Sequence, residues 1–180
     1  MPWLESLFER YLQDEDEHYL LAVNEAVCNA ARYARAGYEN VRIYVDIEIA
    51  PETLSTTVTA DTIPFDVLGL YRKMIAIGKD ASVASEDWGD YTGSSDKSRG
   101  FWMMLAPCRH VDIDINGKSV TLVADRPFST ERLCKTICKL VGRLRIVRGK
   151  DVLDAEGKKI PKKNGLGEVE EKDDPKDFVD

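Results

Sequence analysis

The 180-residue chain lacks the features that mark several specialised classes of protein. It has no run of about 18 apolar residues, so no membrane-spanning helix is expected. Its first residues, MPWLESLFERYLQDEDE, lack the basic region and apolar run of a secretory signal. Basic residues are fewer than acidic ones. The chain has 25 Lys and Arg and 32 Asp and Glu, which gives a net charge of -7. This balance argues against direct nucleic-acid binding, and a cytoplasmic location is expected.

Cysteine is also scarce, and its four positions do not suggest a disulfide scaffold. Cys28, Cys108, Cys134 and Cys138 fit reduced thiols in a cytosolic protein. An alternative is a zinc site, since Cys108, His110, Cys134 and Cys138 could supply four ligands. The two cysteines at positions 134 and 138 are four apart and do not form a CxxC pair, and Cys138 also fits an apolar helix face.

Hydrophobic residues make up 43% and charged residues 32% of the chain, which is ordinary for a globular protein with a core. Periodicity and turn residues give the following elements. The expected helices cover residues 2–13, about 16–36, 66–77, 101–107 and 129–142. The expected strands cover residues 41–50, 54–62, 110–115, 118–125 and 143–148, the third and fourth joined by Asn116-Gly117.

The strands have one apolar and one polar face, and they come in hairpin pairs separated by helices. This pattern predicts an α+β, two-layer sandwich with helices on one face of a mixed, mostly antiparallel sheet. The boundaries are residues 1–127 for the main domain and 128–150 for a C-terminal helix and possible strand. Residues 151–180 are mostly Lys, Asp, Glu and Gly, so we expect a loosely ordered tail.

The most informative stretch is LLAVNEAVCNAARYA, residues 20–34, an alanine-rich helix that carries Glu25 and Asn29 four residues apart. The two side chains share one helix face, one turn from each other. A solvated flank is the simplest interpretation. The many small residues nearby, however, allow other groups to come close. An acid and an amide there could bind hydrated Mg²⁺, or the carboxylate could accept a proton from a nucleophile.

Later segments add to this pair. Asp61 ends the second strand, and the polar loop of residues 78–99 exceeds the about 12–15 residues above which loops are usually functional or disordered. The loop leads to SRGFWMM, where Gly100 is expected to begin a helix whose backbone N–H groups can bind phosphate. Together these pieces suggest a nucleotide site.

On these motifs the chain resembles the histidine-kinase-like ATPase superfamily, and within it the bacterial anti-sigma factors that are serine kinases. AVNEAVCNAARYA resembles the N-box, VTADTIPFD the first glycine box and SRGFWMM the second. CRHVDIDINGKSVTLV resembles the closing hairpin. The resemblance covers residues 4–123, roughly two thirds of the chain, and the order of the motifs carries more weight than any one of them.

The resemblance implies a site that holds ATP and Mg²⁺. Glu25 is the expected general base, Asn29 the residue that holds Mg²⁺ against the phosphates, and Asp61 the acceptor for the adenine amino group. Residues 78–99 are the expected ATP lid, and Gly100 and Phe101 are expected to place backbone amides under the phosphates. The implied activity is phosphorylation of a serine on an anti-anti-sigma protein, which competes with a sigma factor for the kinase.

Arg99 has two interpretations, a charge-assisted contact to the γ-phosphate or a solvated lid arginine. The glycine boxes also depart from the family pattern, because Ile63 and Ser98 stand where glycines are usual and the first box is one residue shorter. The alternative function is therefore a degenerate binding module that regulates by occluding a partner without catalysis. A homodimer is compatible with either function. Residues 128–150 either complete the sheet edge left by the family's missing first strand or bind a partner.

Overall fold

The computed structural model describes residues 6, 17–93, 96–127 and 133–161. The described helices are α2 (Glu17–Arg32), α3 (Val67–Lys79), α4 (Trp88–Thr92), α5 (Asp96–Leu105) and α6 (Ile137–Val141). The described strands are β1 (Ile43–Ile49), β2 (Thr53–Ala60), β3 (His110–Asp114), β4 (Ser119–Asp125), β5 (Leu144–Arg148) and β6 (Asp151–Leu153). The helix predicted for residues 2–13 lies, except for residue 6, outside the described residues.

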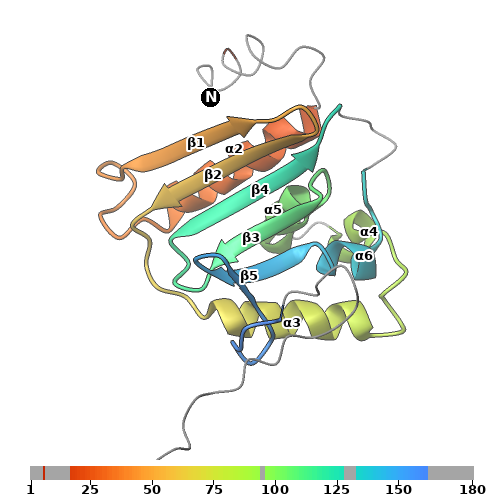
Figure 1. Ribbon diagram of the computed structural model, residues 1–180. Helices are drawn as coiled ribbons and strands as arrows, with labels where there is room; N and C mark the ends of the chain where they lie inside the picture. Colours follow the sequence, from red (N-terminus) through yellow and green to blue (C-terminus); the bar gives the residue numbers. More distant parts are fainter. Residues whose placement is uncertain (1–5, 7–16, 94–95, 128–132, 162–180) are drawn as a thin grey trace, which may run out of the picture.

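The strands form one six-stranded sheet in the order β1-β2-β4-β3-β5-β6 (Figure 1). Neighbouring strands run antiparallel except β3 and β5, which are parallel. Helices α2 and α5 lie against one face of the sheet, and α3 lies beside its β5 end (Figure 1). The α+β class and the mixed, mostly antiparallel sheet predicted from the strand patterns are therefore confirmed.

Strand alternation explains which face of the sheet meets the helices. In β2 every second side chain is buried, namely Leu54, Thr56, Val58 and Ala60, as expected when one face of a strand packs on a core. Tyr19 of α2 reaches this face, and its hydroxyl lies 2.9 Å from the hydroxyl of Thr56 and 3.0 Å from the carbonyl of Leu122. Because a buried hydroxyl needs a partner, these contacts fix how α2 lies on the sheet.

Two local sequence features, a helix cap and a hairpin turn, form the structures that they predict. The carboxylate of Asp66 accepts a hydrogen bond of 2.7 Å from the backbone N–H of Gly69 and caps α3, so the helix expected over residues 66–77 is confirmed. Asn116-Gly117 joins β3 to β4, and Gly117 has φ +69°, which few other residues adopt at low cost.

Helix α2 ends at Arg32, earlier than the predicted end at residue 36. Ala34 instead pairs with Thr62 in an antiparallel bridge, which ties the end of the helix segment to the residues after β2. This long-range pairing stops the helix before Gly37, so the glycine was a misleading end signal.

The described residues of the C-terminal third, 133–161, add two strands to the same sheet and require two corrections. The predicted helix over residues 129–142 shortens to α6, although residues 128–132 lie outside the described part. The loosely ordered tail predicted from Asp151 onward is wrong for residues 151–161. Strand β6 pairs with β5 there, and Leu153 is buried. The strand predicted for residues 143–148 is confirmed as β5, which extends the sheet beside β3.

Arg143 links this C-terminal third to α5. Its Nη1 atom donates hydrogen bonds of 2.8 Å to the carbonyl of Ala106 and 2.7 Å to that of Cys108. Both carbonyls lie just after Leu105, where α5 ends, so the cation binds the chain as it leaves the helix. The end of α5 is thus held by a residue just before β5.

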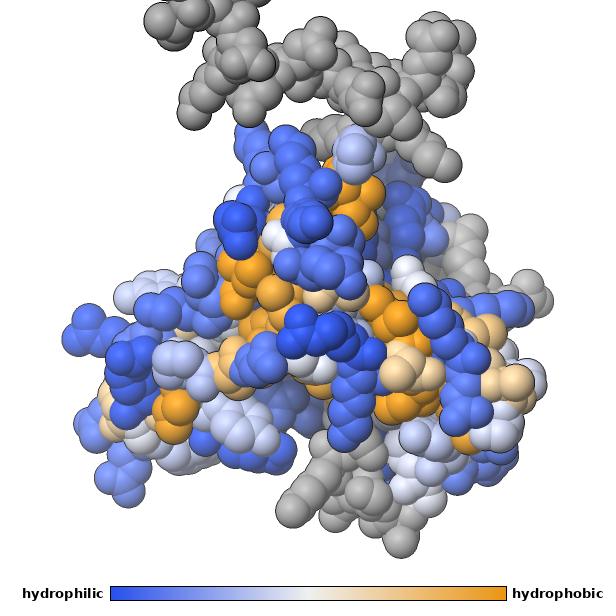
Figure 2. All heavy atoms as spheres, turned by 90° about the horizontal axis from the view of Figure 1, so that it is seen from below, coloured by the Kyte–Doolittle hydropathy of each residue, from blue (hydrophilic) through white to orange (hydrophobic). Residues whose placement is uncertain are grey.

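Seen from below, the side of the molecule that carries α3 shows apolar patches between polar side chains (Figure 2). Among the described residues, no helix combines the length and apolar character needed to cross a bilayer.

Candidate functional site

Glu25 and Asn29 form a hydrogen-bonded pair on α2. Asn29 Nδ2 donates to Glu25 Oε1 over 3.0 Å, and both side chains are half-buried. Arg32, one turn further on, places Nη1 3.4 Å from the Asn29 side-chain oxygen. The prediction that the acid and the amide share one helix face is therefore confirmed. Their half-burial is inconsistent with a fully solvated flank.

Helix α5 packs against this pair at Gly100. A Cβ atom at position 100 would lie 2.0 Å from Glu25 Oε1 and 2.4 Å from its Cδ, closer than atoms can approach. Gly100 is therefore required for the approach of the α5 backbone to the Glu25 carboxylate. We call Glu25, Asn29 and Gly100 the Glu25 centre, and the structure brings these three predicted site residues together.

The expected phosphate-binding helix start is displaced. Helix α5 begins at Asp96, so the prediction that a helix begins at Gly100 is wrong. Backbone N–H groups beyond the first turn bond to the carbonyl four residues earlier, and this includes those of Gly100 and Phe101. The N–H groups without helical partners belong to the first turn of α5, which lies before Gly100. The side chain of Arg99 is exposed, and that of Phe101 packs against the core.

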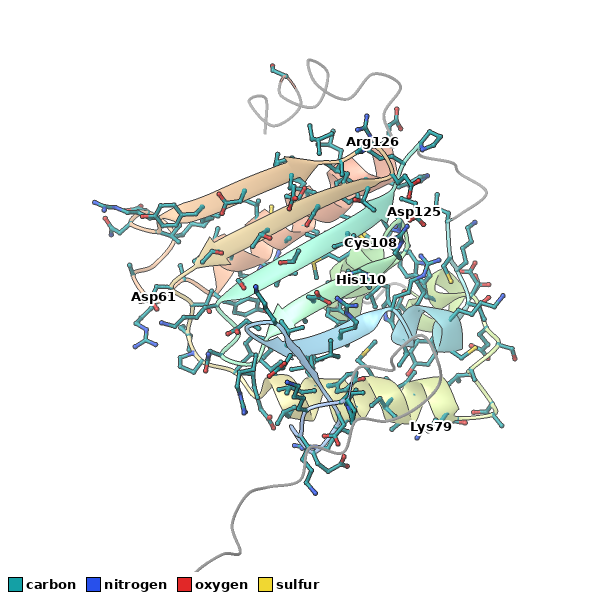
Figure 3. All side chains as sticks on the ribbon, in the orientation of Figure 1. Asp61, Lys79, Cys108, His110, Asp125 and Arg126 are labelled. Carbon is teal, nitrogen blue, oxygen red and sulfur yellow. The ribbon has the colours of Figure 1, made fainter. Side chains whose placement is uncertain are left out.

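Asp61 lies outside the Glu25 centre, beyond the C-terminal end of α2 and at one end of the sheet (Figure 3). Its carboxylate is 3.0 Å from Lys118 Nζ and 3.5 Å from Arg35 Nε, and its side chain is 61% exposed. The hydrogen bond from Lys118 and the charges of both cations hold the pKa of Asp61 below its ordinary value. A carboxylate already paired with two cations is poorly suited to recognise the adenine amino group.

The predicted lid, residues 78–99, is partly ordered by the C-terminal third. The N–H of Trp88 donates to the carbonyl of Lys135 over 2.9 Å, and the N–H of Cys138 donates to that of Ala84 over 2.9 Å. Asp87 and Thr136 form an antiparallel bridge between the same segments. These bonds hold residues 84–88 against the start of α6, while residues 94–95 lie outside the described part.

The zinc alternative is not supported by the described residues. Cys108 and Cys134 are buried, whereas Cys28 and Cys138 are exposed. No group of three or more His, Cys, Asp or Glu side chains able to hold a metal ion occurs in the described part of the chain. The described cysteines form no disulfide with one another.

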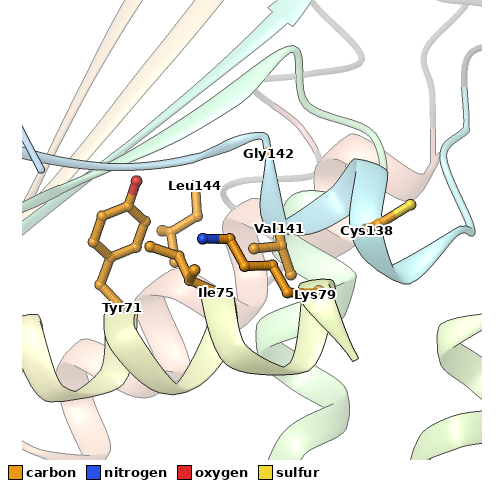
Figure 4. A pocket seen from close by; sticks show the side chains of 8 residues that line it. Tyr71, Ile75, Lys79, Cys138, Val141, Gly142 and Leu144 are labelled. Carbon is orange, nitrogen blue, oxygen red and sulfur yellow. The ribbon is translucent and has the colours of Figure 1, made fainter. Parts of the chain in front are cut away.

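A pocket that the sequence analysis did not identify lies between α3, α6 and β5 (Figure 4). Its volume is about 320 Å³, and it is lined by Tyr71, Ile75, Gly78, Lys79, Cys138, Val141, Gly142 and Leu144. Lys79 extends across it toward Leu144, whereas the thiol of Cys138 points away (Figure 4). One ammonium group among mostly apolar walls is too few donors for a triphosphate. No sequence signal marked this pocket, because α3 and α6 are far apart in the chain.

A charged cluster crosses the outer face of the sheet, and the sequence analysis missed it too. Arg145 of β5 donates hydrogen bonds of 2.6 and 2.7 Å to the two carboxylate oxygens of Asp112, which lies opposite it on β3. His110 Nε2 is 3.9 Å from Asp112 Oδ2, and Arg109 pairs with Asp125. Burial, and then the charge of Arg145, lower the pKa of His110 below its ordinary value. The arrangement is that of a cross-strand network that holds β5 to β3.

Comparisons with known proteins add no family assignment. No protein-family model, no curated protein and no solved structure matched the chain. The function must therefore be argued from the geometry described above.

Proposed function

We propose that this chain is a regulatory protein-binding module with a histidine-kinase-like ATPase arrangement. It acts in the cytoplasm by occluding a sigma factor or an anti-anti-sigma partner, without catalysis. The observation that carries the proposal is the state of the Glu25 centre, whose polar groups are occupied by one another rather than directed at a ligand.

Three features of this centre support the proposal. The Glu25 carboxylate accepts the Asn29 amide and lies against the Gly100 backbone. The N–H groups at positions 100 and 101 are used inside α5. Residues 84–88 of the predicted lid are bonded to the start of α6. In the resemblance, the triphosphate uses the amides at positions 100 and 101 under a movable lid, and here those amides and residues 84–88 of the lid are already engaged.

A second candidate is a Mg²⁺-dependent protein serine kinase. The convergence of Glu25, Asn29 and Gly100 favours it, since an acid and an amide oxygen are ligands that Mg²⁺ accepts. In that function Glu25 is the base, Asn29 holds Mg²⁺ against the phosphates of ATP, and Arg99 meets the γ-phosphate. The oxygen ligands fit Mg²⁺, but the engaged backbone amides and the paired Asp61 do not fit the rest of ATP.

Thermal melting with and without millimolar Mg-ATP decides between the two candidates. A ligand at about 100 times its Kd adds about 2.7 kcal/mol of stability, which shifts the melting temperature by several degrees. The binding-module proposal predicts no shift for the wild type, Asn29→Ala or Asp61→Asn. A wild-type shift that both substitutions abolish would place nucleotide at the predicted residues, and radiolabel transfer from ATP would then be measured.

A further inference from the structure

The end of the sheet near Asp61 carries an ordered two-stranded ribbon. Ala34 and Thr62 pair in it, with the N–H of Arg35 donating to the carbonyl of Asp61 over 2.9 Å. The N–H of Ile63 donates to the carbonyl of Tyr33 over 2.8 Å. Side chains alternate along paired strands, and Ala34 and Thr62 are buried. Tyr33 and Ile63 therefore lie opposite each other on the outward side.

Three large apolar side chains are exposed at this ribbon. Tyr33 is 54%, Ile63 56% and Phe65 47% exposed. The Phe65 ring lies against the Gly117 backbone, since a Cβ at position 117 would be 2.5 Å from its Cε1 atom. Single exposed apolar residues are ordinary, but neighbouring aromatic and aliphatic side chains are typical of the centre of a protein interface.

The backbone under these side chains is held in place. The buried hydroxyl of Thr62 donates to the carbonyl of Gly117 over 2.9 Å, which ties the ribbon to the β3–β4 turn. Lys118, the next residue, pairs with Asp61. A surface fixed before binding loses little conformational entropy when a partner docks, and this favours affinity.

Two of the three charged side chains that pair at this ribbon are positive. Arg35 and Lys118 share the single carboxylate of Asp61, so this group of three charges has a net charge of +1. The whole chain, in contrast, has a net charge of -7. Two cations and one anion are too few for a nucleic-acid backbone, where affinity rises with the number of neutralised phosphates.

We propose that these six residues, which we call the Ile63 patch (Tyr33, Arg35, Asp61, Ile63, Phe65 and Lys118), dock an acidic segment of a protein partner through its apolar side chains. The partner's apolar anchors cover Tyr33, Ile63 and Phe65, and its carboxylates approach Arg35 and Lys118. This inference rests on the proposed binding function and names the surface that performs it.

The test uses the full chain and a random peptide library displayed on phage. Selection on the wild type is followed by counter-selection on the double variant Ile63→Ser/Phe65→Ser. We expect the enriched peptides to combine aliphatic or aromatic residues with Asp or Glu. A synthetic copy of the best peptide should bind the double variant at least about tenfold more weakly, since truncating interface hot spots costs more than about 1.4 kcal/mol.

Matched variants separate the apolar part of the patch from its charge. Lys118→Glu should weaken peptide binding and reduce its dependence on salt, because exposed charges are screened by ions. Ile160→Ser changes another exposed apolar side chain, 43% exposed and in a different segment, and should leave binding unchanged. Each variant is melted alongside the wild type to show that it is folded.

Enriched peptides that are neutral or basic would overturn the proposal, as would binding that survives the double variant. Sedimentation velocity tests whether a second copy of this chain occupies the Ile63 patch. Self-association that the double variant abolishes would identify a second copy of this chain and would also overturn it. These experiments are done without nucleotide. A Mg-ATP shift that depends on Asn29 therefore refutes the proposed function alone, and peptide binding that does not depend on the patch refutes this inference alone.

Discussion

The Glu25 centre and the Ile63 patch both take residues from the segment 25–35, yet their polar groups are arranged in opposite ways. In the first, the carboxylate of Glu25 meets an amide and a glycine backbone within the fold. In the second, Asp61 is paired with two exposed cations beside exposed apolar side chains. A group that is satisfied inside the protein contributes to structure, whereas an ordered exposed surface is available to a partner.

The cause of this difference is packing. Helix α5 covers the middle of α2 and brings Trp102 into the core with only 2% of its surface exposed. The ribbon of Ala34 and Thr62 lies beyond the end of the helix, and there the chain turns its larger side chains outward. The two regions should therefore respond differently to the same kind of substitution.

Trp102→Ala should have the largest effect on stability. Removing a buried tryptophan lowers the free energy of unfolding by about 3–5 kcal/mol, because apolar contacts are lost and a cavity remains. Ile63→Ser, in the exposed patch, should change it by less than about 0.5 kcal/mol. Urea denaturation of both variants measures the difference. Similar costs for the two would show that the patch is part of the core.

The same contrast explains which parts of the site could be predicted. Glu25 and Asn29 are four residues apart on one helix, so their pairing follows from helix geometry alone. The ion pairs of Asp61 join residues 35, 61 and 118, and no local pattern encodes that contact. Local spacing was sufficient for the first region and insufficient for the second.

Wrong element boundaries have a similar physical origin. The prediction that a helix begins at Gly100 rests on its place after the polar loop, but Gly100 lies inside α5, where it allows the close approach of Glu25. The prediction of a loosely ordered tail over residues 151–180 rests on their high content of charged residues and glycine. Leu153 nevertheless supplies enough burial, with pairing to β5, to order a short strand. Both errors arise from contacts between distant segments.

Gly117→Ala should have the second-largest effect, at the patch. The residue has φ +69°, and an added Cβ would lie 2.5 Å from the Phe65 ring, so both backbone strain and a displaced ring are expected. A loss of about 1–3 kcal/mol in unfolding free energy follows from the backbone strain alone. Reduced affinity for the selected peptide should accompany it.

Gly149→Ala is the matched control, since Gly149 has φ +58° and no atom within 4 Å of an added Cβ. It reports the cost of the backbone conformation without the ring contact. If both alanine variants lose the same stability and both bind the peptide normally, then the Phe65 ring is not held by Gly117.

The contact at the Glu25 centre should appear as a coupling of about 1 kcal/mol. Alanine in a helix interior is favoured over glycine by about 1 kcal/mol, but at position 100 it displaces the Glu25 side chain. Gly100→Ala should therefore be nearly neutral in the wild type and stabilising in Glu25→Ala. A double-mutant cycle by urea denaturation measures the coupling. Additive effects would mean that the carboxylate moves away without cost.

The smallest expected effect concerns His110, on the outer face of the sheet. It is surrounded by Asp112 and Arg145 and by the ion pair of Arg109 with Asp125. Burial and Arg145 lower its pKa in the folded state relative to the unfolded chain. Below about pH 6.5 the unfolded state therefore binds a proton that the folded state resists, so protein stability falls as the pH falls.

His110→Gln should remove this part of the pH dependence. We expect the free energy of unfolding, measured with urea from about pH 8 to about pH 5, to fall less steeply in the variant than in the wild type. Acidic groups titrate at lower pH in both proteins, so the difference between the two curves should be confined to the histidine range.

An unchanged slope in His110→Gln would show that His110 takes up a proton equally in the folded and unfolded chain. The network that joins β3 to β5 would then stabilise the sheet independently of this histidine, through Asp112 and Arg145 alone.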